Sequence, residues 1–293
     1  MQVENLPGLQ VLPLRTPTLP PATHTNCYLL GEERLWIVDP GSPYENEIEK
    51  LADTLAAIRA AGISLEAIFL THHHPDHIGS VAAISKRFDL PVAAHPLTLA
   101  RIDGNHREIS LDEGSSVELD HLRCWKAWHT PGHAPGHLCL YSESDGLLIA
   151  GDMIPGIGTI LIDPSEGDMK AYLHHLGRLA DLNPHHIYPA HGPRLDEGRK
   201  AINNLIAHRL MREERIFDTL GKQNDVDNTD QEGQPRDISY VVAKAYDDVP
   251  PAAIPFALRS TEAHLLKLVD DGRVVRTDDD RWLALKALPE TMG

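Results

Sequence analysis

Short apolar runs alternate with amphipathic stretches along residues 25–190 of this 293-residue chain. The short runs have the length and composition of strands, and the amphipathic stretches repeat their apolar residues at helical spacing. Strands are expected at 25–31, 34–41, 66–72, 91–96 and 185–192, hairpins at 116–133 and 137–152, and helices at 44–62, 79–88 and 167–182. This alternation predicts a layered α/β domain whose helices lie on the outside.

The last third of the chain has a different pattern. A helix is expected from Glu197 to about Lys222, and the segment KQNDVDNTDQEGQPRD after it is polar and rich in turn-forming residues. Further on, two helices (238–246 and 256–272) and a hairpin (273–285) are expected, which is the outline of a winged-helix module. The predicted division is a main domain, 1–222, a linker, 223–236, and a winged-helix-like domain, 237–293.

Composition narrows the class of protein. Hydrophobic residues make up 42% of the chain, and no apolar run approaches the roughly 20 residues of a membrane span. The N-terminus lacks a basic start followed by an apolar stretch, so we expect a cytoplasmic protein with no membrane partner. Cys27, Cys124 and Cys139 are far apart, which argues against a disulfide framework.

The charge of the chain bears on its partners. The formal net charge is −16, and binding to nucleic acid depends largely on Lys and Arg releasing counterions from phosphates. A nucleic-acid partner is therefore disfavoured, although a local basic patch would still leave room for RNA. A small molecule is the expected partner. The apolar segment VPPAAIPFAL near the C-terminus would suit the contact of a homodimer.

The densest chemical signal is the segment Thr71–His77, THHHPDH, at the end of an apolar strand. In an extended chain alternate residues point the same way, so His72 and His74 can hold one cation. Asp76 and His77 follow where the chain turns into the next helix, and they can face a second cation. Neutral imidazole suits Zn, Fe, Co and Ni, while carboxylate can hold or bridge hard divalent ions.

Three more ligand-type residues end apolar strands: His133 in HTPGH, Asp152 in LLIAGD and His191 in IYPAHG. Ligand sites of α/β sheets lie at the carboxyl ends of their strands. We therefore expect these three residues to meet the histidine-rich segment at one edge of the fold.

The motifs THHHPDH, TPGH, GD and PAHG, in this order, resemble those of the metallo-β-lactamase superfamily over residues 20–195. The resemblance implies an αββα four-layer sandwich as a catalytic domain, with the winged-helix-like domain after it. It implies, position by position, a first metal at His72, His74 and His133, a second at Asp76, His77 and His191, and Asp152 as the bridge. Asp39 in IVDPG resembles the residue that orients a ligand histidine.

The chemistry that the resemblance implies is hydrolysis with two divalent metal ions. Zinc is the default, and a ligand set of His and Asp also permits Fe or Mn. Two such cations lower the pKa of a shared water, so that a bridging hydroxide attacks a carbonyl or phosphorus atom. Asp76 and Asp152 are the catalytic residues expected to accept or relay a proton. No G-x-S-x-G motif offers a serine nucleophile.

Three other residues have alternative roles. His137, in TPGHAPGH, is expected either to support a metal ligand or to be a hydrogen-bonded histidine of a buried strand. Tyr172 lies on a helical face, where substrate contact and core packing both remain open. His208 lies near Arg209 and Arg212 on the long helix, which gives either a pocket for an anionic group and substrate contact or a solvated helix face.

Three alternatives are considered for the function of the site. The layout resembles the branch that contains the lactamase-beta-like endoribonuclease, and fungal acyl-carrier-protein thioesterases are also similar around THHHPDH. The C-terminal helix and hairpin, TEAHLLKLVDDG and RTDDDRW, carry acidic residues that would repel phosphates. We therefore favour a small ester, thioester or lactone. Single-stranded RNA is the alternative, and a non-catalytic binding role is the second alternative.

Overall fold

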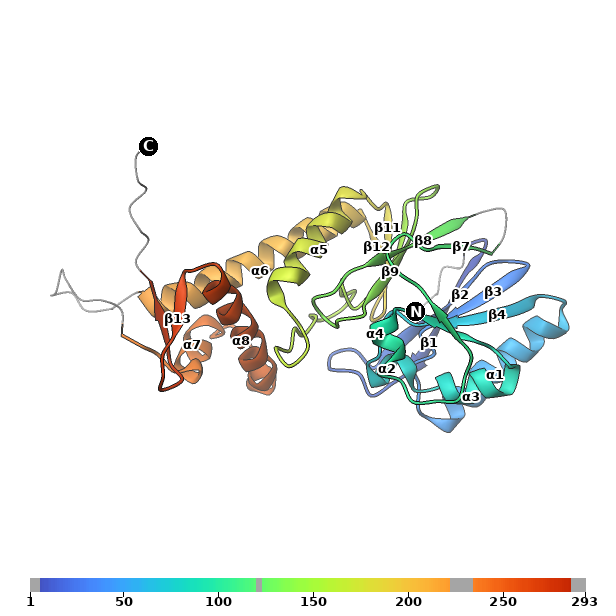
Figure 1. Ribbon diagram of the computed structural model, residues 1–293, viewed down its shortest axis with the longest axis horizontal. Helices are drawn as coiled ribbons and strands as arrows, with labels where there is room; N and C mark the ends of the chain where they lie inside the picture. Colours follow the sequence, from blue (N-terminus) through green and yellow to red (C-terminus); the bar gives the residue numbers. More distant parts are fainter. Residues whose placement is uncertain (1–5, 120–122, 222–233, 286–293) are drawn as a thin grey trace.

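The computed structural model describes residues 6–119, 123–221 and 234–285. Figure 1 shows a body of two sheets with helices on the outside, from which helix α6 (Gly198–Gly221) leads to a smaller C-terminal unit. The predicted linker, 223–236, lies largely outside the described residues, so the domain limits stay a prediction. Within the described ranges, every helix is too short or too polar to cross a membrane.

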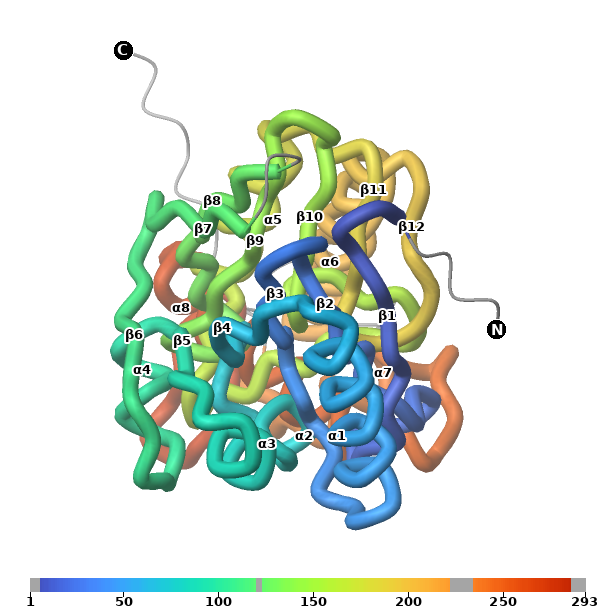
Figure 2. Tube along the Cα trace, turned by 90° about the vertical axis from the view of Figure 1, so that its right-hand side faces the viewer, coloured from blue at the N-terminus to red at the C-terminus, as the bar shows by residue number. Residues whose placement is uncertain are grey.

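The first sheet has six strands that lie side by side in chain order (Figure 2). Strands β1 to β3 form an antiparallel meander, and β3 to β6 run parallel because helical segments connect them. The strands are β1 (Leu9–Arg15), β2 (His24–Leu30), β3 (Arg34–Val38), β4 (Ser64–Phe69), β5 (Val92–Ala94) and β6 (Glu108–Ser110).

The second sheet also has six strands, in the order β12-β11-β10-β9-β8-β7. Its pairs are antiparallel except β10 with β11, which helix α5 (Met169–Asp181) connects. The strands are β7 (Ser116–Glu118), β8 (Cys124–His129), β9 (Leu138–Ser142), β10 (Leu147–Gly151), β11 (His186–Pro189) and β12 (Leu195–Asp196).

Helices cover the outer face of each sheet. Helices α1 (Glu45–Ala60) and α3 (Val81–Phe88) bury residues such as Leu55 and Ile84 against Ile37 and Ile68 of the first sheet. Helices α5 and α6 bury Leu176 and Ile202 against Leu148 of the second sheet. Two short helices, α2 (Pro75–Ile78) and α4 (Pro96–Leu99), follow the ends of β4 and β5. The predicted αββα order of layers is confirmed.

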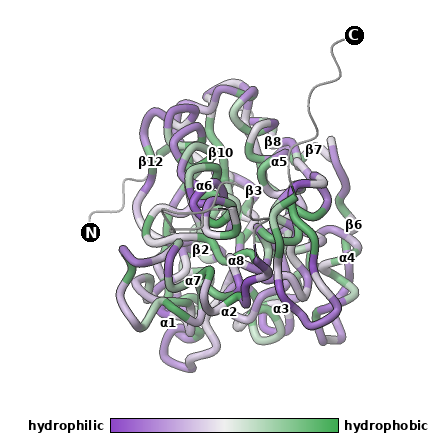
Figure 3. Tube along the Cα trace, turned by 90° about the vertical axis from the view of Figure 1, so that its left-hand side faces the viewer, coloured by the Kyte–Doolittle hydropathy of each residue, from purple (hydrophilic) through white to green (hydrophobic). Residues whose placement is uncertain are grey.

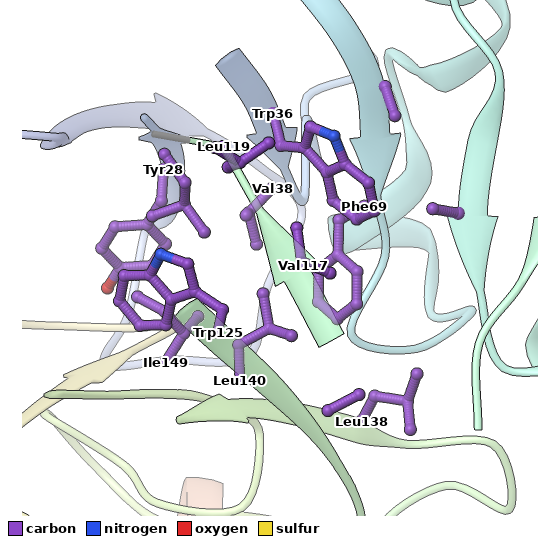
Figure 4. Packing of buried hydrophobic residues seen from close by; sticks show 14 of the residues in the cluster. Tyr28, Trp36, Val38, Phe69, Val117, Leu119, Trp125, Leu138, Leu140 and Ile149 are labelled. Atoms are coloured by element: carbon purple, nitrogen blue, oxygen red, sulfur yellow. The ribbon is translucent and has the colours of Figure 1, made fainter. Parts of the chain in front are cut away.

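The main core lies between the two sheets. Trp36 and Phe69 of the first sheet stack with ring centroids 6.3 Å apart, and they belong to one cluster with Trp125, Leu140 and Ile149 of the second sheet (Figure 4). Hydrophobic segments are concentrated within the molecule and hydrophilic ones toward its periphery (Figure 3). Burial of this apolar surface holds the two sheets face to face, which fixes the position of their strand ends.

The C-terminal unit has a core of its own. It consists of α7 (Ile238–Ala245), the short helix η1 (Pro251–Ala253), α8 (Ile254–Asp270), β13 (Val274–Arg276) and β14 (Trp282–Ala284). Val241, Leu268 and Trp282 pack together with Ile216 from the last turns of α6. The predicted outline of helix, helix and hairpin is confirmed, and α6 belongs to the core of both parts of the molecule.

Strand β1 is absent from the predicted strands. Its run LQVLPLR contains Pro13, which has no N–H group and normally argues against a central strand. The structure places β1 at the edge of the first sheet, where it pairs only with β2. This edge position tolerates the proline. The segment between β1 and β2 becomes important below, because it forms one wall of the functional cleft.

Candidate metal centre

The structure brings together all seven residues that the sequence nominates as metal ligands. They belong to segments that follow strand ends: His72 and His74 after β4, Asp76 and His77 on α2, His133 after β8, Asp152 after β10 and His191 after β11. The opposed strand ends of the two sheets therefore build one site, as the rule for α/β sheets predicts.

Three imidazoles form a first group. His72 Nε2 lies 2.9 Å from His74 Nδ1, and His133 Nε2 lies 3.2 Å from the former and 2.9 Å from the latter. With Zn–N bonds of about 2.1 Å, the edge of a tetrahedron measures about 3.4 Å. The three nitrogens thus form a triangle of nearly the size that one tetrahedral cation requires.

Asp76, His77 and His191 form a second group. His77 Nε2 lies 3.9 Å from Asp76 Oδ1, and His191 Nε2 lies 3.5 Å from Asp76 Oδ2. This group is wider than the first, and it combines two nitrogens with a carboxylate, which suits divalent ions of borderline or hard character.

Asp152 lies between the two groups. Its Oδ1 is 3.3 Å from His191 Nε2 and 3.7 Å from His77 Nε2, whereas its Oδ2 is 3.5 Å from His133 Nε2. One carboxylate oxygen therefore faces each group. This is the arrangement of a bridging ligand.

Each of the five histidines is anchored through the ring nitrogen that points away from the centre. The anchoring contacts are His72 Nδ1 to Thr71 Oγ1 at 3.0 Å, His74 Nε2 to Glu166 Oε1 at 2.7 Å, His77 Nδ1 to Asp39 Oδ2 at 2.8 Å, His133 Nδ1 to the Leu161 carbonyl at 2.9 Å and His191 Nδ1 to the His24 carbonyl at 3.0 Å. Carboxylates and carbonyls accept only, and the Thr71 hydroxyl donates its proton to Asp39 Oδ2 and so accepts from His72. The anchored nitrogen therefore carries the proton in a neutral ring.

The consequence is a set of unprotonated nitrogens that face each other. In the neutral tautomers that the anchors select, His72, His74 and His133 direct three lone pairs into one triangle, where no proton separates them. Buried lone pairs at this distance repel each other unless a cation lies between them. The side chains present therefore fit a metal ion better than they fit one another.

Two buried atoms support the same conclusion. His77 Nε2 and Asp152 Oδ1 have no hydrogen-bond partner among the described residues, although both side chains are almost completely buried. Buried polar atoms without a partner are rare because they cost free energy. A cation placed between these two atoms would satisfy both of them at once.

The charges of the site shift the pKa values of its residues in opposite directions. Burial opposes the charged form of His77, but Asp39, Asp152 and Asp76 outweigh it and raise its pKa well above the usual value. Burial would raise the pKa of Asp152, but His191 and His77 hold it well below the usual value. In the first group, burial lowers the pKa of His133 to about 4, so this imidazole is neutral at pH 7.

Asp39 has the orienting position that the resemblance implies. Besides His77 Nδ1, its carboxylate accepts hydrogen bonds from the backbone N–H and the hydroxyl of Thr71 at 2.8 and 2.6 Å. Its φ of +47° is unusual for a non-glycine residue. The strained turn after β3 therefore directs one buried carboxylate at two neighbouring segments of the site.

His137 supports Asp152 through the backbone. Its Nε2 accepts from the Asp152 N–H at 3.1 Å, and its Nδ1 lies 2.9 Å from Thr130 Oγ1. Gly151 has a φ of +51°, and a Cβ at this position would lie 2.5 Å from His137 Nε2. The glycine thus allows β10 to approach His137 closely enough for this hydrogen bond.

Tyr172 and His208 are the two residues for which substrate contact is one of the expected alternatives. Tyr172 is fully buried and its hydroxyl donates to the Met153 carbonyl at 2.8 Å, so substrate contact by this residue is wrong and core packing is right. The periodicity of α5 shows which face is apolar but not which layer covers it. His208 is exposed on α6 and lines a different cavity from the one above the metal ligands.

Glu166 is a residue of the site that the sequence did not reveal. Its carboxylate lies 2.7 Å from His74 Nε2 and 3.0 Å from His73 Nε2. It belongs to the irregular segment between β10 and α5, where no strand end or motif marks it. Its proximity to His74 depends on the path of that segment through space, and the sequence offers no signal of this path.

An open cleft of about 330 Å³ lies above the ligands. The candidate ligands His74, Asp76 and Asp152 form part of its floor. Residues 17–22, between β1 and β2, form one wall, and residues 157–166 form another. Leu19 and Ile157 in these walls are 46% and 43% exposed, which is unusual for large apolar side chains. The cleft gives a small molecule access to both groups of ligands.

Comparisons with known proteins agree with this architecture. Residues 20–191 match the family described as Metallo-beta-lactamase superfamily, and residues 238–282 match the family described as Beta-lactamase associated winged helix domain. The first match contains all seven candidate ligands, and the second lies within the C-terminal unit.

Two relatives are similar over most of the chain. Beta-lactamase-like protein 2 homolog of Caenorhabditis elegans is 30% identical over 85% of this chain and 80% of its own length. Atrochrysone carboxyl ACP thioesterase of Emericella nidulans is 27% identical over 90% of this chain and 81% of its own length.

Two solved structures are also similar. A beta-lactamase domain protein from Burkholderia ambifaria has a TM-score of 0.81, with 24% identity, over 96% of this chain and 93% of that chain. TTHA1623 in a di-iron-bound form has a TM-score of 0.52, with 32% identity, over 65% of this chain and 97% of that chain. The former covers both parts of the molecule, and the latter covers less of the chain.

Proposed function

The chain belongs to the metallo-β-lactamase superfamily of hydrolases, and on this premise we propose that it is a dinuclear hydrolase of small esters, thioesters or lactones. The observation that carries the dinuclear part is the placement of Asp152, whose two oxygens face two separate groups of ligand atoms. A single ion would use only one of these groups.

When bound, two divalent ions would polarise the scissile carbonyl and lower the pKa of the attacking water. The residues of this chain orient the metal-binding imidazoles and transfer the proton. Thr71, Asp39, Glu166 and two backbone carbonyls hold the imidazoles in the tautomer that leaves their inner nitrogens unprotonated. Asp76 lies at the floor of the cleft and is partly exposed, so its carboxylate is placed to accept a proton from water and return it to the leaving group.

Covalent catalysis by cysteine receives no support. Cys27 and Cys139 are buried, and burial raises the pKa of the Cys139 thiol to about 12. Cys124 is exposed but does not line the cleft. Water activated by the metal ions is therefore the nucleophile that we propose.

The shape and charge of the cleft favour a small acyl substrate. Its walls carry apolar side chains, among them Leu19, Ile157 and Leu161, and the acidic side chain of Glu166, while the carboxylate of Asp163 is paired with Arg259. A polynucleotide would bring phosphates toward the Glu166 carboxylate, whereas a neutral ester or thioester would not. The thioesterase name of one relative supports the same class. Zinc is the proposed metal, and the di-iron form of a similar structure makes iron its competitor.

A turnover experiment tests this proposal. Protein loaded with Zn²⁺ is assayed on short thioesters, esters and lactones, and on single-stranded RNA, beside the Asp152→Ala variant. We expect hydrolysis of at least one acyl substrate and its loss in the variant. RNA cleavage that depends on Asp152 would instead establish the nuclease alternative. A metal-loaded protein inactive on every substrate would favour the non-catalytic binding role.

A further inference from the structure

A second cavity of about 310 Å³ adjoins the cleft above the metal ligands. The two cavities share six lining residues, which come from two segments of the main domain: Leu19, Pro20, Pro21, Gly158, Thr159 and Leu161. The other side of the second cavity is formed by α6 and by the C-terminal unit. A ligand held at the metal centre therefore has room to extend between the two parts of the molecule.

The walls of the second cavity are mainly apolar. The C-terminal unit contributes Val249, Ala253 and Phe256, which face Leu161 and Pro20 of the main domain. Leu19, which borders both cavities, leaves nearly half of its surface uncovered. Such walls favour an apolar chain, because burial of each methylene strengthens binding by about fourfold.

Two buried arginines, Arg209 and Arg212, interrupt the apolar wall. Arg209 is only 5% exposed, and it donates to Thr159 Oγ1 at 3.2 Å and to the Ile160 carbonyl. Its Nε has no hydrogen-bond partner among the described residues, and within those residues no carboxylate forms an ion pair with it. Its neighbours on α6 differ, since Arg212 pairs with Asp248 and Arg215 with Asp247.

A buried guanidinium without a carboxylate is costly, because the interior offers little solvation for its charge. An anionic group in the cavity would supply the missing counter-charge. His208 lines the same cavity, and burial together with Arg209 and Arg212 lowers its pKa, so it is a neutral hydrogen-bonding group there. Arg209 is thus the element of this wall that distinguishes an anionic chain end from a neutral one.

We propose that the second cavity binds one arm of the substrate, an apolar chain that ends in a carboxylate, and that Arg209 selects this carboxylate. The proposal rests on the hydrolase function proposed above and specifies its substrate class as acyl compounds with an acidic far end. It also gives the C-terminal unit a role, since six of the fifteen residues that line the arm's binding site belong to it.

The direct test is equilibrium binding of free acids to the metal-loaded protein by calorimetric titration, with acetate, octanoate and octanedioate as probes. We expect octanoate to bind more tightly than acetate, and octanedioate about tenfold more tightly than octanoate, as a charge-assisted hydrogen bond allows. Arg209→Gln should remove the preference for octanedioate over octanoate. Equal binding of the three acids to the wild-type protein would overturn the proposal.

A second variant keeps the test decisive if Arg209→Gln does not fold. Ala253→Trp places a large side chain in the cavity and should reduce binding of both long acids by more than about tenfold. Ala252→Trp is the matched control, because Ala252 is exposed and does not line the cavity. An unchanged affinity in Ala253→Trp would show that the acids bind elsewhere and would overturn the proposal.

Turnover separates this inference from the proposed function. With acetyl, octanoyl and octanedioyl thioesters, the arm's binding site predicts a KM that falls along the series and rises for the long substrates in Ala253→Trp. Hydrolysis of all three with equal KM would support the hydrolase and overturn the inference. Selective binding of octanedioate without hydrolysis of any thioester would support the cavity and refute the hydrolase.

Discussion

The metal centre and the cavity beside it are built by different means. Every candidate ligand of the metal centre follows a strand of the main domain, and five anchoring hydrogen bonds fix the rings. The cavity has walls from two parts of the molecule and two buried arginines, of which Arg212 pairs with Asp248 and Arg209 has no carboxylate partner among the described residues. In this account the strand ends of the main domain determine the chemistry of the metal centre. The junction between the main domain and the C-terminal unit determines which substrate binds there.

The largest effect should come from the bridging carboxylate. Asp152→Ala removes the carboxylate whose two oxygens face the two groups of candidate ligands, so we expect turnover to fall by more than about a hundredfold. This exceeds the loss typical for residues that only support a ligand. Initial rates on a short thioester measure this loss. Asp103→Ala, at an exposed position, is the control and should keep its rate. Equal rates for the two variants would show that the chemistry does not depend on the strand ends.

Leu268→Ala should affect stability but not the metal centre. Leu268 is completely buried in the core of the C-terminal unit, so its truncation should cost about 2–5 kcal/mol of unfolding free energy. Chemical denaturation measures the cost, and metal analysis of the folded variant should match the wild-type protein. Leu266→Ala, at a site that is 38% exposed, should cost less. Loss of metal from folded Leu268→Ala would show that the two regions are not separable.

Glu166→Gln should weaken metal binding by about tenfold to a hundredfold, since partners of ligand histidines typically contribute this much. The amide removes the negative charge beside His74 Nε2 while nearly keeping the shape of the side chain. Competition with a chelator measures the affinity. Glu45→Gln, at an exposed position of α1, is the control. An unchanged affinity would limit the anchoring role to the other four contacts.

The smallest effect concerns pH and the C-terminal unit. Burial lowers the pKa of His264, although its 3.0 Å contact with Glu213 opposes the shift. Below about pH 6.5 the unfolded chain protonates this histidine and the folded one does not, so stability falls as the pH drops from 6.5 toward the folded pKa. A single group gives at most about 1.4 kcal/mol per pH unit.

Denaturation midpoints at several pH values between about 5 and 7.5 measure the slope. His264→Gln should make the slope shallower without abolishing it, because the lowered pKa of His133 contributes a slope of the same sign. Metal affinity at the upper end of this range should not change, since the metal centre lies in the other region. A slope that is the same in His264→Gln would assign the pH dependence to other groups.

Much of the metal centre could be predicted from the sequence, because its ligands obey local rules. His72 and His74 alternate on an extended segment, and Asp152 and His191 end apolar runs. Each of these positions can therefore be recognised from its own stretch of sequence, without knowledge of its contacts in space. The orienting role of Asp39 was implied by the family resemblance rather than by such a local rule. The αββα layers followed from the periodicity of strands and helices together with the resemblance.

Features that depend on the path of irregular segments could not be predicted. Glu166 approaches His74 from a loop, Pro13 concealed the edge strand β1, and Tyr172 faces the core although its helix passes near the site. The sequence left open whether Arg209 belongs to a solvated helix face or to a pocket for an anionic group, and it gave no sign that Arg209 is buried against the segment that carries Ile160. In each case a contact between distant segments, rather than spacing along the chain, decides the role of the residue.

The number of metal ions that the purified, zinc-reconstituted protein holds is the decisive quantity, and mass spectrometry measures it. Two groups of ligand atoms with Asp152 between them predict about two ions per chain, and fewer in Asp152→Ala. Turnover should disappear on chelation and return when the metal is restored. Full turnover in metal-free protein, or saturation of the wild-type protein at a single ion, would contradict a dinuclear hydrolase.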